Sequence, residues 1–172
     1  MCETQCTSTN SLIWREFCWK NLTRYFITPK IKSRQLAIRQ DCWRLCGSVE
    51  ADHAHIFWNC IKMRIFWQNV NSVVKNVLGY EIPNTCPVMY LGNIEKVVMK
   101  EDLYLTKVLL AASKKAVTRN WLNVNAPKQE QWLEIVQEIL VMEKLTYLLR
   151  LKENVFEKKW GKWNIYMRHD TN

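Results

Sequence analysis

A chain of 172 residues with a net charge of +9 is long enough for one ordinary domain. Nearly half of its residues are hydrophobic and nine are tryptophan, which excludes a disordered chain. The excess of positive charge favours a polyanionic partner, and nucleic acid is favoured over a membrane surface. The sequence contains no run of about 20 apolar residues, so no membrane helix is predicted.

The N-terminal stretch MCETQCTSTN is polar and has no secretory-signal pattern, so we expect an intracellular protein, without deciding between nucleus and cytoplasm. In a reducing compartment, clustered cysteines are typical of metal sites and not of a disulfide scaffold.

Residues 1–41 are predicted to form a basic lead-in. Near-helical spacing of Ile13, Phe17, Leu22 and Phe26 predicts a helix over 11–28 that ends at Pro29 and runs into an extended segment.

No acidic residue occurs from position 17 to position 40, whereas six cations do: Lys20, Arg24, Lys30, Lys32, Arg34 and Arg39. The aromatic residues Trp19, Tyr25 and Phe26 are interleaved with them. Cations neutralise phosphates and aromatic faces stack on unpaired bases, so this stretch is a candidate surface for RNA or single-stranded DNA. A solvated basic helix and turn is the alternative.

Residues 42–78 are predicted to be a zinc-binding module with a following helix. The spacing is Cys42-x3-Cys46-x8-His55-x4-Cys60. Two close pairs of ligand-type residues separated by a loop can surround one tetrahedral Zn²⁺, and Gly47 permits a tight turn after the first pair. His53 is the alternative fourth ligand. We prefer His55, because a helical turn lets it point inward with Cys60. Burial of the same side chains as core residues is the competing interpretation.

Helical periodicity continues through the rest of the chain. After Cys60, one apolar face predicts an amphipathic helix that ends at Gly79, formed by Phe66, Val70, Val73, Val74 and Val77. Residues 79–99 are predicted to be a connection with a short extended piece at 87–92. Residues 100–172 are predicted to form a C-terminal helical region: a helix over 101–122, a helix from Pro127 to about Leu151, and a last helix packed through Phe156, Trp160 and Trp163.

Three lysines recur at intervals of seven in the first of these C-terminal helices: Lys100, Lys107 and Lys114. They are predicted to line one side of the helix, as a solvated face or along a phosphate backbone. The expected architecture is all-α, a helical bundle with an N-terminal zinc-knuckle module.

Catalytic motifs are missing from the sequence. No two aspartates are neighbours that could hold a metal pair, and there is no glycine-rich phosphate loop, no serine elbow and no H-E-x-x-H motif. We therefore expect neither an enzyme nor a small-molecule substrate.

Several segments of the chain resemble the C-terminal region of LINE-type non-LTR retrotransposon polyproteins. In chain order they are RYFITPKIKS, CWRLCG, HIFWNC, FWQNVNSVV, YLGNI and LLAASKKAVTRNWL. The resemblance extends from about Ser11 to Tyr166 and includes the reverse-transcriptase zinc-binding segment. It implies that Cys42, Cys46, His55 and Cys60 are the ligands and that the partner is the element's RNA or target DNA.

The aromatic-x-Asp-Asp box of a reverse transcriptase has no counterpart here, so the resemblance implies a detached tail. Two alternatives follow from that origin. The chain is a structural or protein-interaction fragment that once packed on the missing reverse transcriptase body, or it is a truncated copy with no selected function.

Overall fold

Helices account for all regular structure in residues 11–170, the part of the chain that the computed structural model describes, so the all-α expectation is confirmed. The first ten residues of the predicted lead-in and the last two residues of the chain lie outside this range. The long helices are α2 (Leu12–Leu22), α3 (Pro29–Leu36), α4 (Arg64–Leu78), α5 (Leu103–Arg119), α6 (Gln129–Leu149) and α7 (Glu153–Asp170). Shorter turns are η1 (His55–Asn59), η2 (Ile61–Met63), η3 (Cys86–Tyr90) and η4 (Lys100–Asp102).

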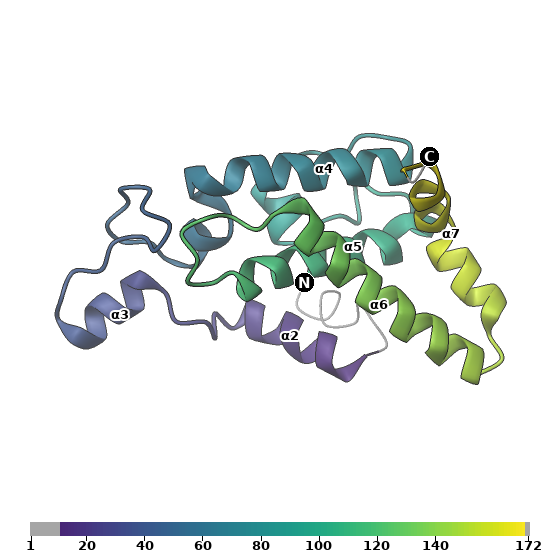
Figure 1. Cartoon of the computed structure of the whole chain (residues 1–172), viewed down its shortest axis with the longest axis horizontal. Coiled ribbons are helices and arrows are strands. Elements are labelled where there is room, and N and C mark those ends of the chain that lie inside the picture. Colours follow the sequence, from purple (N-terminus) through teal and green to yellow (C-terminus); the bar gives the residue numbers. More distant parts are fainter. Residues whose placement is uncertain (1–10, 171–172) are drawn as a thin grey trace.

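The central helix is α5, which packs against α2, α4, α6 and α7 (Figure 1). Its small residues Ala112 and Ala116 are fully buried and let neighbouring helices approach closely. α3 and the loop after it project at one end of the molecule, and α7 lies at the other. One hydrophobic core includes buried residues from Cys42 to Trp163. The predicted zinc-binding module (42–78), the connection (79–99) and the C-terminal region (100–172) all contribute residues to this core.

The helix after Cys60 matches its prediction. The five apolar residues predicted for one face of α4 are all buried, and Gly79 ends the helix with φ of 83°. Glycine adopts this left-handed conformation without the steric penalty of a Cβ atom, which explains why the helix stops there.

The prediction for residues 11–28 is wrong in its boundary. α2 ends at Leu22, and Pro29 starts α3 instead of ending the first helix. Thr28 caps α3, because its Oγ1 accepts a hydrogen bond from the backbone N–H of Ile31 at 3.3 Å. A threonine before a proline is a helix-start signal, and it was read as a stop. Ile13, predicted to be on the apolar face, is 76% exposed.

Two further predictions are corrected. Residues 86–90 form a π-helical turn where 87–92 was predicted to be extended. Lys114 is buried, so the three lysines at intervals of seven do not share a solvated face. Lys107 forms an ion pair with Glu95, and Lys100 is exposed. Because other helices surround α5 on most sides, Lys114 lies inside the protein.

The C-terminal helices pack through their tryptophans, as predicted. Trp132 is fully buried on α6, and its Nε1 donates to the carbonyl oxygen of Leu109 on α5 at 3.1 Å. On α7, Phe156, Trp160 and Trp163 are all buried. None of the helices within residues 11–170 combines the length and the apolar character needed to cross a membrane.

Candidate metal centre and basic surface

Cys42 and Cys46 lie in the loop after α3. The backbone N–H of Leu45 donates to the carbonyl oxygen of Cys42 at 2.8 Å, and the N–H of Cys42 donates to that of Ser48 at 2.9 Å. Leu45 and Gly47 have φ values of 54° and 83°. The loop therefore turns back on itself between the two cysteines, and the tight turn predicted at Gly47 is present.

His55 and Cys60 lie at the two ends of η1, a single π-helical turn. The N–H of Cys60 donates to the carbonyl oxygen of His55, five residues earlier, at 2.9 Å. In an α-helix, residues five apart point about 140° away from each other, and the wider π-turn reduces this angle. The side chain of Asp52 holds the start of the turn by accepting from the N–H of His55 at 2.9 Å. The turn thus explains how a four-residue gap brings both side chains to one site.

The potential ligand atoms of Cys42, Cys46, His55 and Cys60 all lie within 4.8 Å of one another. The Sγ of Cys46 is 3.3 Å from Nε2 of His55. Around one tetrahedral zinc ion, with Zn–S bonds of about 2.3 Å, sulfur atoms are about 3.8 Å apart. The three thiols and the imidazole are therefore close enough together to hold one metal ion.

The thiols differ in acidity. Burial raises the pKa of Cys42 to about 12 and also raises the pKa of Cys60. Burial acts on Cys46 in the same direction, but hydrogen bonds from the Ser48 backbone and the two neighbouring thiols outweigh it and lower its pKa. Two adjacent buried thiolates repel each other and lose hydration, so the cluster needs a cation to become fully deprotonated.

Arg44 is buried beside this cluster, with 0% of its surface exposed. Its Nη1 donates to the carbonyl oxygen of Ile56 at 3.0 Å, whereas Nε and Nη2 have no hydrogen-bond partner among the described residues. Burial lowers the pKa of Arg44, and the neighbouring Cys60 and Cys42 raise it. A divalent ion with three thiolates has a net charge of about −1, which one guanidinium balances. No role was predicted for Arg44, although a cation between two cysteine ligands was the available signal.

His53, the alternative ligand, lies outside the group of four. Its side chain is buried, its ring centroid is 6.4 Å from that of Trp121, and its Nε2 has no partner within the described part of the chain. The structure therefore gathers His55, and not His53, with the three cysteines.

The six cations predicted to contact nucleic acid fall into two groups. Three of them form ion pairs with flanking carboxylates: Lys20 with Glu16 at 2.6 Å, Lys30 with Glu50 at 3.0 Å and Arg39 with Asp41 at 3.1 Å. The other three are exposed and have no ion-pair partner in residues 11–170: Arg24, Lys32 and Arg34.

The three aromatic residues of this stretch also divide. Trp19 is 54% exposed and Tyr25 is 64% exposed. Phe26 instead packs inward, with its ring centroid 5.5 Å from that of Trp121 and 6.3 Å from that of Phe57. Trp19 and Tyr25 thus keep ring surface exposed for stacking, although Nζ of Lys20 lies over the Tyr25 ring, 5.1 Å from its centroid. Phe26 attaches the segment to the core.

No model of a known protein family matches the chain, and a comparison with curated proteins gives no match. The chemistry of the Cys/His cluster and of the basic surface is therefore the basis for inferring a function.

Proposed function

We propose that the chain is a non-catalytic, zinc-binding module that binds RNA or single-stranded DNA. Three thiolates and one imidazole suit zinc, which takes nitrogen and sulfur ligands in tetrahedral geometry. Four protein ligands leave no open position for a reacting water, so the zinc is structural. When bound, it contributes on the order of 10 kcal/mol to the folding of the loops that hold it.

The observation that supports nucleic-acid binding is the exposed set of cations and aromatic rings on α2, α3 and the segment between them: Arg24, Lys32, Arg34, Trp19 and Tyr25. Cations attract phosphates, and exposed aromatic faces stack on unpaired bases, which favours a single strand over a duplex.

The metal loop also positions this surface. The N–H of Lys30 donates to the carbonyl oxygen of Ala51 at 3.1 Å, and the N–H of Gln40 donates to Oγ of Ser33 at 2.8 Å. These bonds join the first turn and the middle of α3 to the segments on either side of the cysteine loop. Loss of zinc is therefore expected to displace α3 and to weaken nucleic-acid binding.

The resemblance to the C-terminal region of LINE-type retrotransposon polyproteins supports the same function. On this proposal the 172 residues correspond to the C-terminal region of a reverse-transcriptase polyprotein, including its zinc-knuckle module. The partner is then the RNA template or target DNA of such an element.

The experiment is a titration of labelled single-stranded RNA, followed by fluorescence anisotropy at several salt concentrations. Contacts to all six cations predict a slope of log affinity against log salt of roughly −4, and contacts to the three unpaired cations predict roughly −2. Removal of zinc with a chelator should weaken binding. A slope near zero would reject the proposal.

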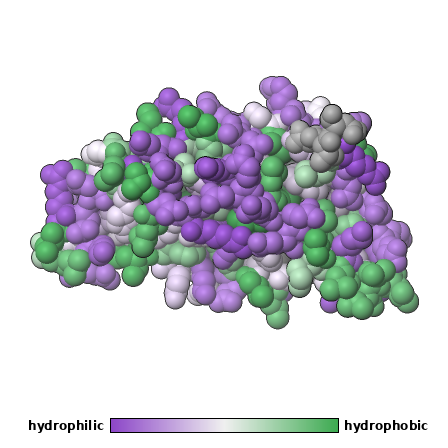
Figure 2. Space-filling model, viewed as in Figure 1, coloured by the Kyte–Doolittle hydropathy of each residue, from purple (hydrophilic) through white to green (hydrophobic). Residues whose placement is uncertain are grey.

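A second candidate, a protein-interaction fragment, is favoured by one observation. Several apolar side chains at the end of α6 and the turn into α7 are exposed: Leu145, Leu148, Leu149 and Leu151. Figure 2 shows hydrophobic surface at this end of the molecule. Exposed apolar patches are typical of protein contacts, and a reverse transcriptase body is the candidate partner. Concentration-dependent self-association without RNA affinity would favour this function over the first.

A further inference from the structure

Lys114 is a buried cation without a counter-charge. It lies on α5 with 5% of its surface exposed, close to the thiol of Cys18, and no ion pair joins its Nζ to a carboxylate in the described range. Burial lowers the pKa of Lys114, as expected for an ammonium group removed from water. A buried charge that lacks a partner destabilises a protein, so an anion at this position would be strongly stabilised.

Beside Lys114 is a cavity of about 290 Å³ that lies between α2, η3 and α5. Asn21 and His53 line it and are each only 6% exposed. Among the residues that the structure describes, neither the amide nitrogen nor the amide oxygen of Asn21 has a hydrogen-bond partner, and Nε2 of His53 has none. Buried polar atoms in folded proteins are nearly always paired, so three unpaired ones in the same cavity indicate a polar ligand.

The charge of the cavity selects the sign of that ligand. Arg24 lines it in addition to Lys114, and no Asp or Glu is among the described residues that line it. Arg24 has φ of 54°, a left-handed conformation that is uncommon for a residue with a side chain. Residues in such conformations concentrate at ligand-binding sites.

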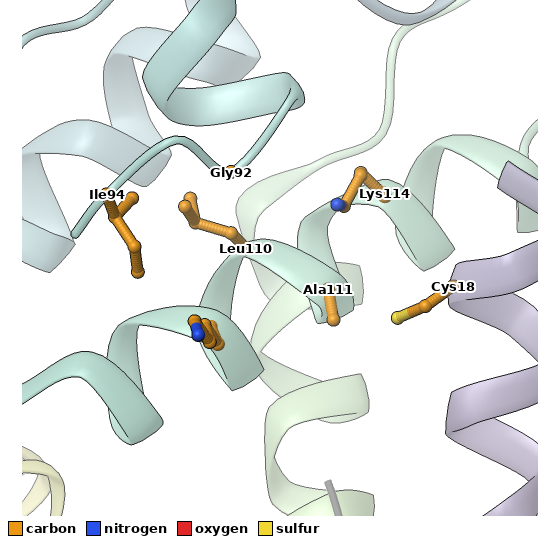
Figure 3. Close-up of a pocket in the computed structure, with 7 residues that line it drawn as sticks. Cys18, Gly92, Ile94, Leu110, Ala111 and Lys114 are labelled. Atoms are coloured by element: carbon orange, nitrogen blue, oxygen red, sulfur yellow. The ribbon is translucent and has the colours of Figure 1, made fainter. Parts of the chain in front are cut away.

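A second, smaller cavity touches Lys114 as well, and it does not fit an anion (Figure 3). Its volume is about 20 Å³, which is room for a single water molecule. Figure 3 shows Cys18 pointing from α2 toward Ala111, with Leu110 and Ile94 nearby, so its wall is largely apolar. The larger cavity is therefore the one in which an anion can meet Lys114.

We propose that the cavity formed by Asn21, Arg24, His53 and Lys114 binds a phosphoryl group. These four polar side chains line the space together with Leu22, Ala54, Cys86, Tyr90 and Leu91. A phosphoryl group has three strong acceptor oxygens where a carboxylate has two. A phosphate oxygen that keeps its proton can also donate to an acceptor atom such as the amide oxygen of Asn21. The group can come from free inorganic phosphate or from the terminal phosphate of a nucleic-acid strand.

The site does not depend on the proposed function, because inorganic phosphate alone tests it. Arg24 belongs both to the exposed basic surface and to the wall of the cavity, however, so a strand on that surface could place its end here.

The test measures the affinity of the zinc-loaded chain for inorganic phosphate by calorimetry, together with its melting temperature in phosphate and in chloride of equal ionic strength. Phosphate should bind and raise the melting temperature. Lys114→Met should weaken phosphate binding by about thirtyfold or more, because it removes the buried charge partner. In chloride it should melt no lower than the wild type, since an unpaired buried charge is gone. Lys144→Met, which makes the same charge change on the exposed side of α6, should leave phosphate binding unchanged.

Two outcomes overturn the proposal: phosphate stabilises the wild type no more than chloride does, or it stabilises Lys114→Met equally. A single-stranded RNA with and without a terminal phosphate distinguishes the sources. Tighter binding of the phosphorylated strand that depends on Lys114 identifies a strand end, and equal binding of both strands identifies free phosphate. If RNA does not bind at all while phosphate does, the proposed function fails and the phosphate site stands.

Discussion

The Nη1 of Arg44 donates a hydrogen bond to the carbonyl oxygen of Ile56 at 3.0 Å. Arg44 lies between Cys42 and Cys46, and Ile56 directly follows His55, so this bond joins the two halves of the Cys/His cluster. The fully buried guanidinium also places a positive charge next to the three thiols. Arg44 thus has both a geometric and an electrostatic reason to affect metal binding.

Arg44→Met should therefore lower zinc affinity by about 10- to 100-fold, the usual effect of losing an outer-shell partner of a metal ligand. Competition with a chromophoric chelator measures this affinity. Arg44→Lys keeps the charge but not the planar guanidinium, so its zinc affinity should lie between those of the wild type and Arg44→Met. Arg34→Met removes an exposed arginine and serves as the control. Wild-type affinity in Arg44→Met would show that the buried charge does not act on the metal.

The purified chain should contain one zinc per molecule, measured by elemental analysis. Cys60→Ser should lose it, because serine is a poor zinc ligand and Cys60 closes the π-turn of the cluster. Cys86→Ser is the matched control, since Cys86 lies outside the group of four. Equal zinc content in the two variants would reject the Cys42, Cys46, His55 and Cys60 site.

Some of this architecture could be predicted because a single local pattern decides it. In α4 one apolar face meets one core, so the periodicity of Phe66, Val70 and Val74 is sufficient to identify the helix and its buried side. The grouping of the three cysteines with a histidine follows from spacing, because both pairs are close in sequence and the intervening loop is short. Spacing left His53 as an alternative, and the π-turn at His55 decides between them.

Other features depend on contacts that sequence spacing does not contain. The position of Lys114 was predicted wrongly because α5 is covered on most sides, and a row at intervals of seven does not show which side is free. The partners of Lys30 and Arg39, Glu50 and Asp41, lie just beyond the acid-free stretch, so the composition of that stretch overstated the number of unpaired cations.

The ion pairs on the basic surface lead to an ordered set of RNA affinities. Substitution of Arg24, Lys32 or Arg34 by glutamate should weaken RNA binding more than the same change at Lys20, Lys30 or Arg39. The second group must first release a carboxylate before contacting a phosphate. Arg34→Glu should reduce affinity uniformly across RNA sequences, because a phosphate contact does not read bases.

Anisotropy titrations with several RNA sequences measure these differences, and Lys144→Glu on α6 controls for total charge. If Lys144→Glu bound RNA as weakly as Arg34→Glu does, the loss of affinity would be due to net charge and not to this surface.

Acid should weaken the contact between α5 and α6. The guanidinium of Arg119 donates to both carboxylate oxygens of Glu138, at 3.0 and 2.7 Å. These hydrogen bonds, aided by the charge of Arg119, hold the pKa of Glu138 below its usual value. A lowered folded-state pKa means that the stabilisation is complete above the unfolded pKa of about 4.3 and is lost as pH falls through the folded pKa.

Glu138→Gln should therefore reduce the free energy of unfolding by about 0.5–1 kcal/mol at neutral pH, since both side chains are partly exposed. The difference from the wild type should shrink below about pH 4. Urea unfolding at several pH values measures it, with Glu157→Gln as an exposed control. A difference that is independent of pH would show that the ion pair is not its source.

Glu143 joins three helices, and its removal should destabilise the protein more than the loss of the Arg119–Glu138 ion pair. It is buried on α6, where its carboxylate accepts hydrogen bonds from the hydroxyl of Tyr104 on α5 and from Nε1 of Trp160 on α7, the latter at 2.9 Å. Burial and the neighbouring carboxylate raise the pKa of Tyr104, so its hydroxyl remains a donor. Glu143→Leu leaves the buried Nε1 of Trp160 and the half-buried hydroxyl of Tyr104 without this acceptor, which should lower the free energy of unfolding by about 2–4 kcal/mol. Glu143→Gln keeps one acceptor oxygen, so its free energy of unfolding should fall by about half as much.

Urea unfolding of the zinc-loaded chain measures the free energy of unfolding of both variants, and Lys144→Leu at the adjacent exposed position is the control. If Glu143→Leu were as stable as the control, the carboxylate would not hold α5, α6 and α7 together.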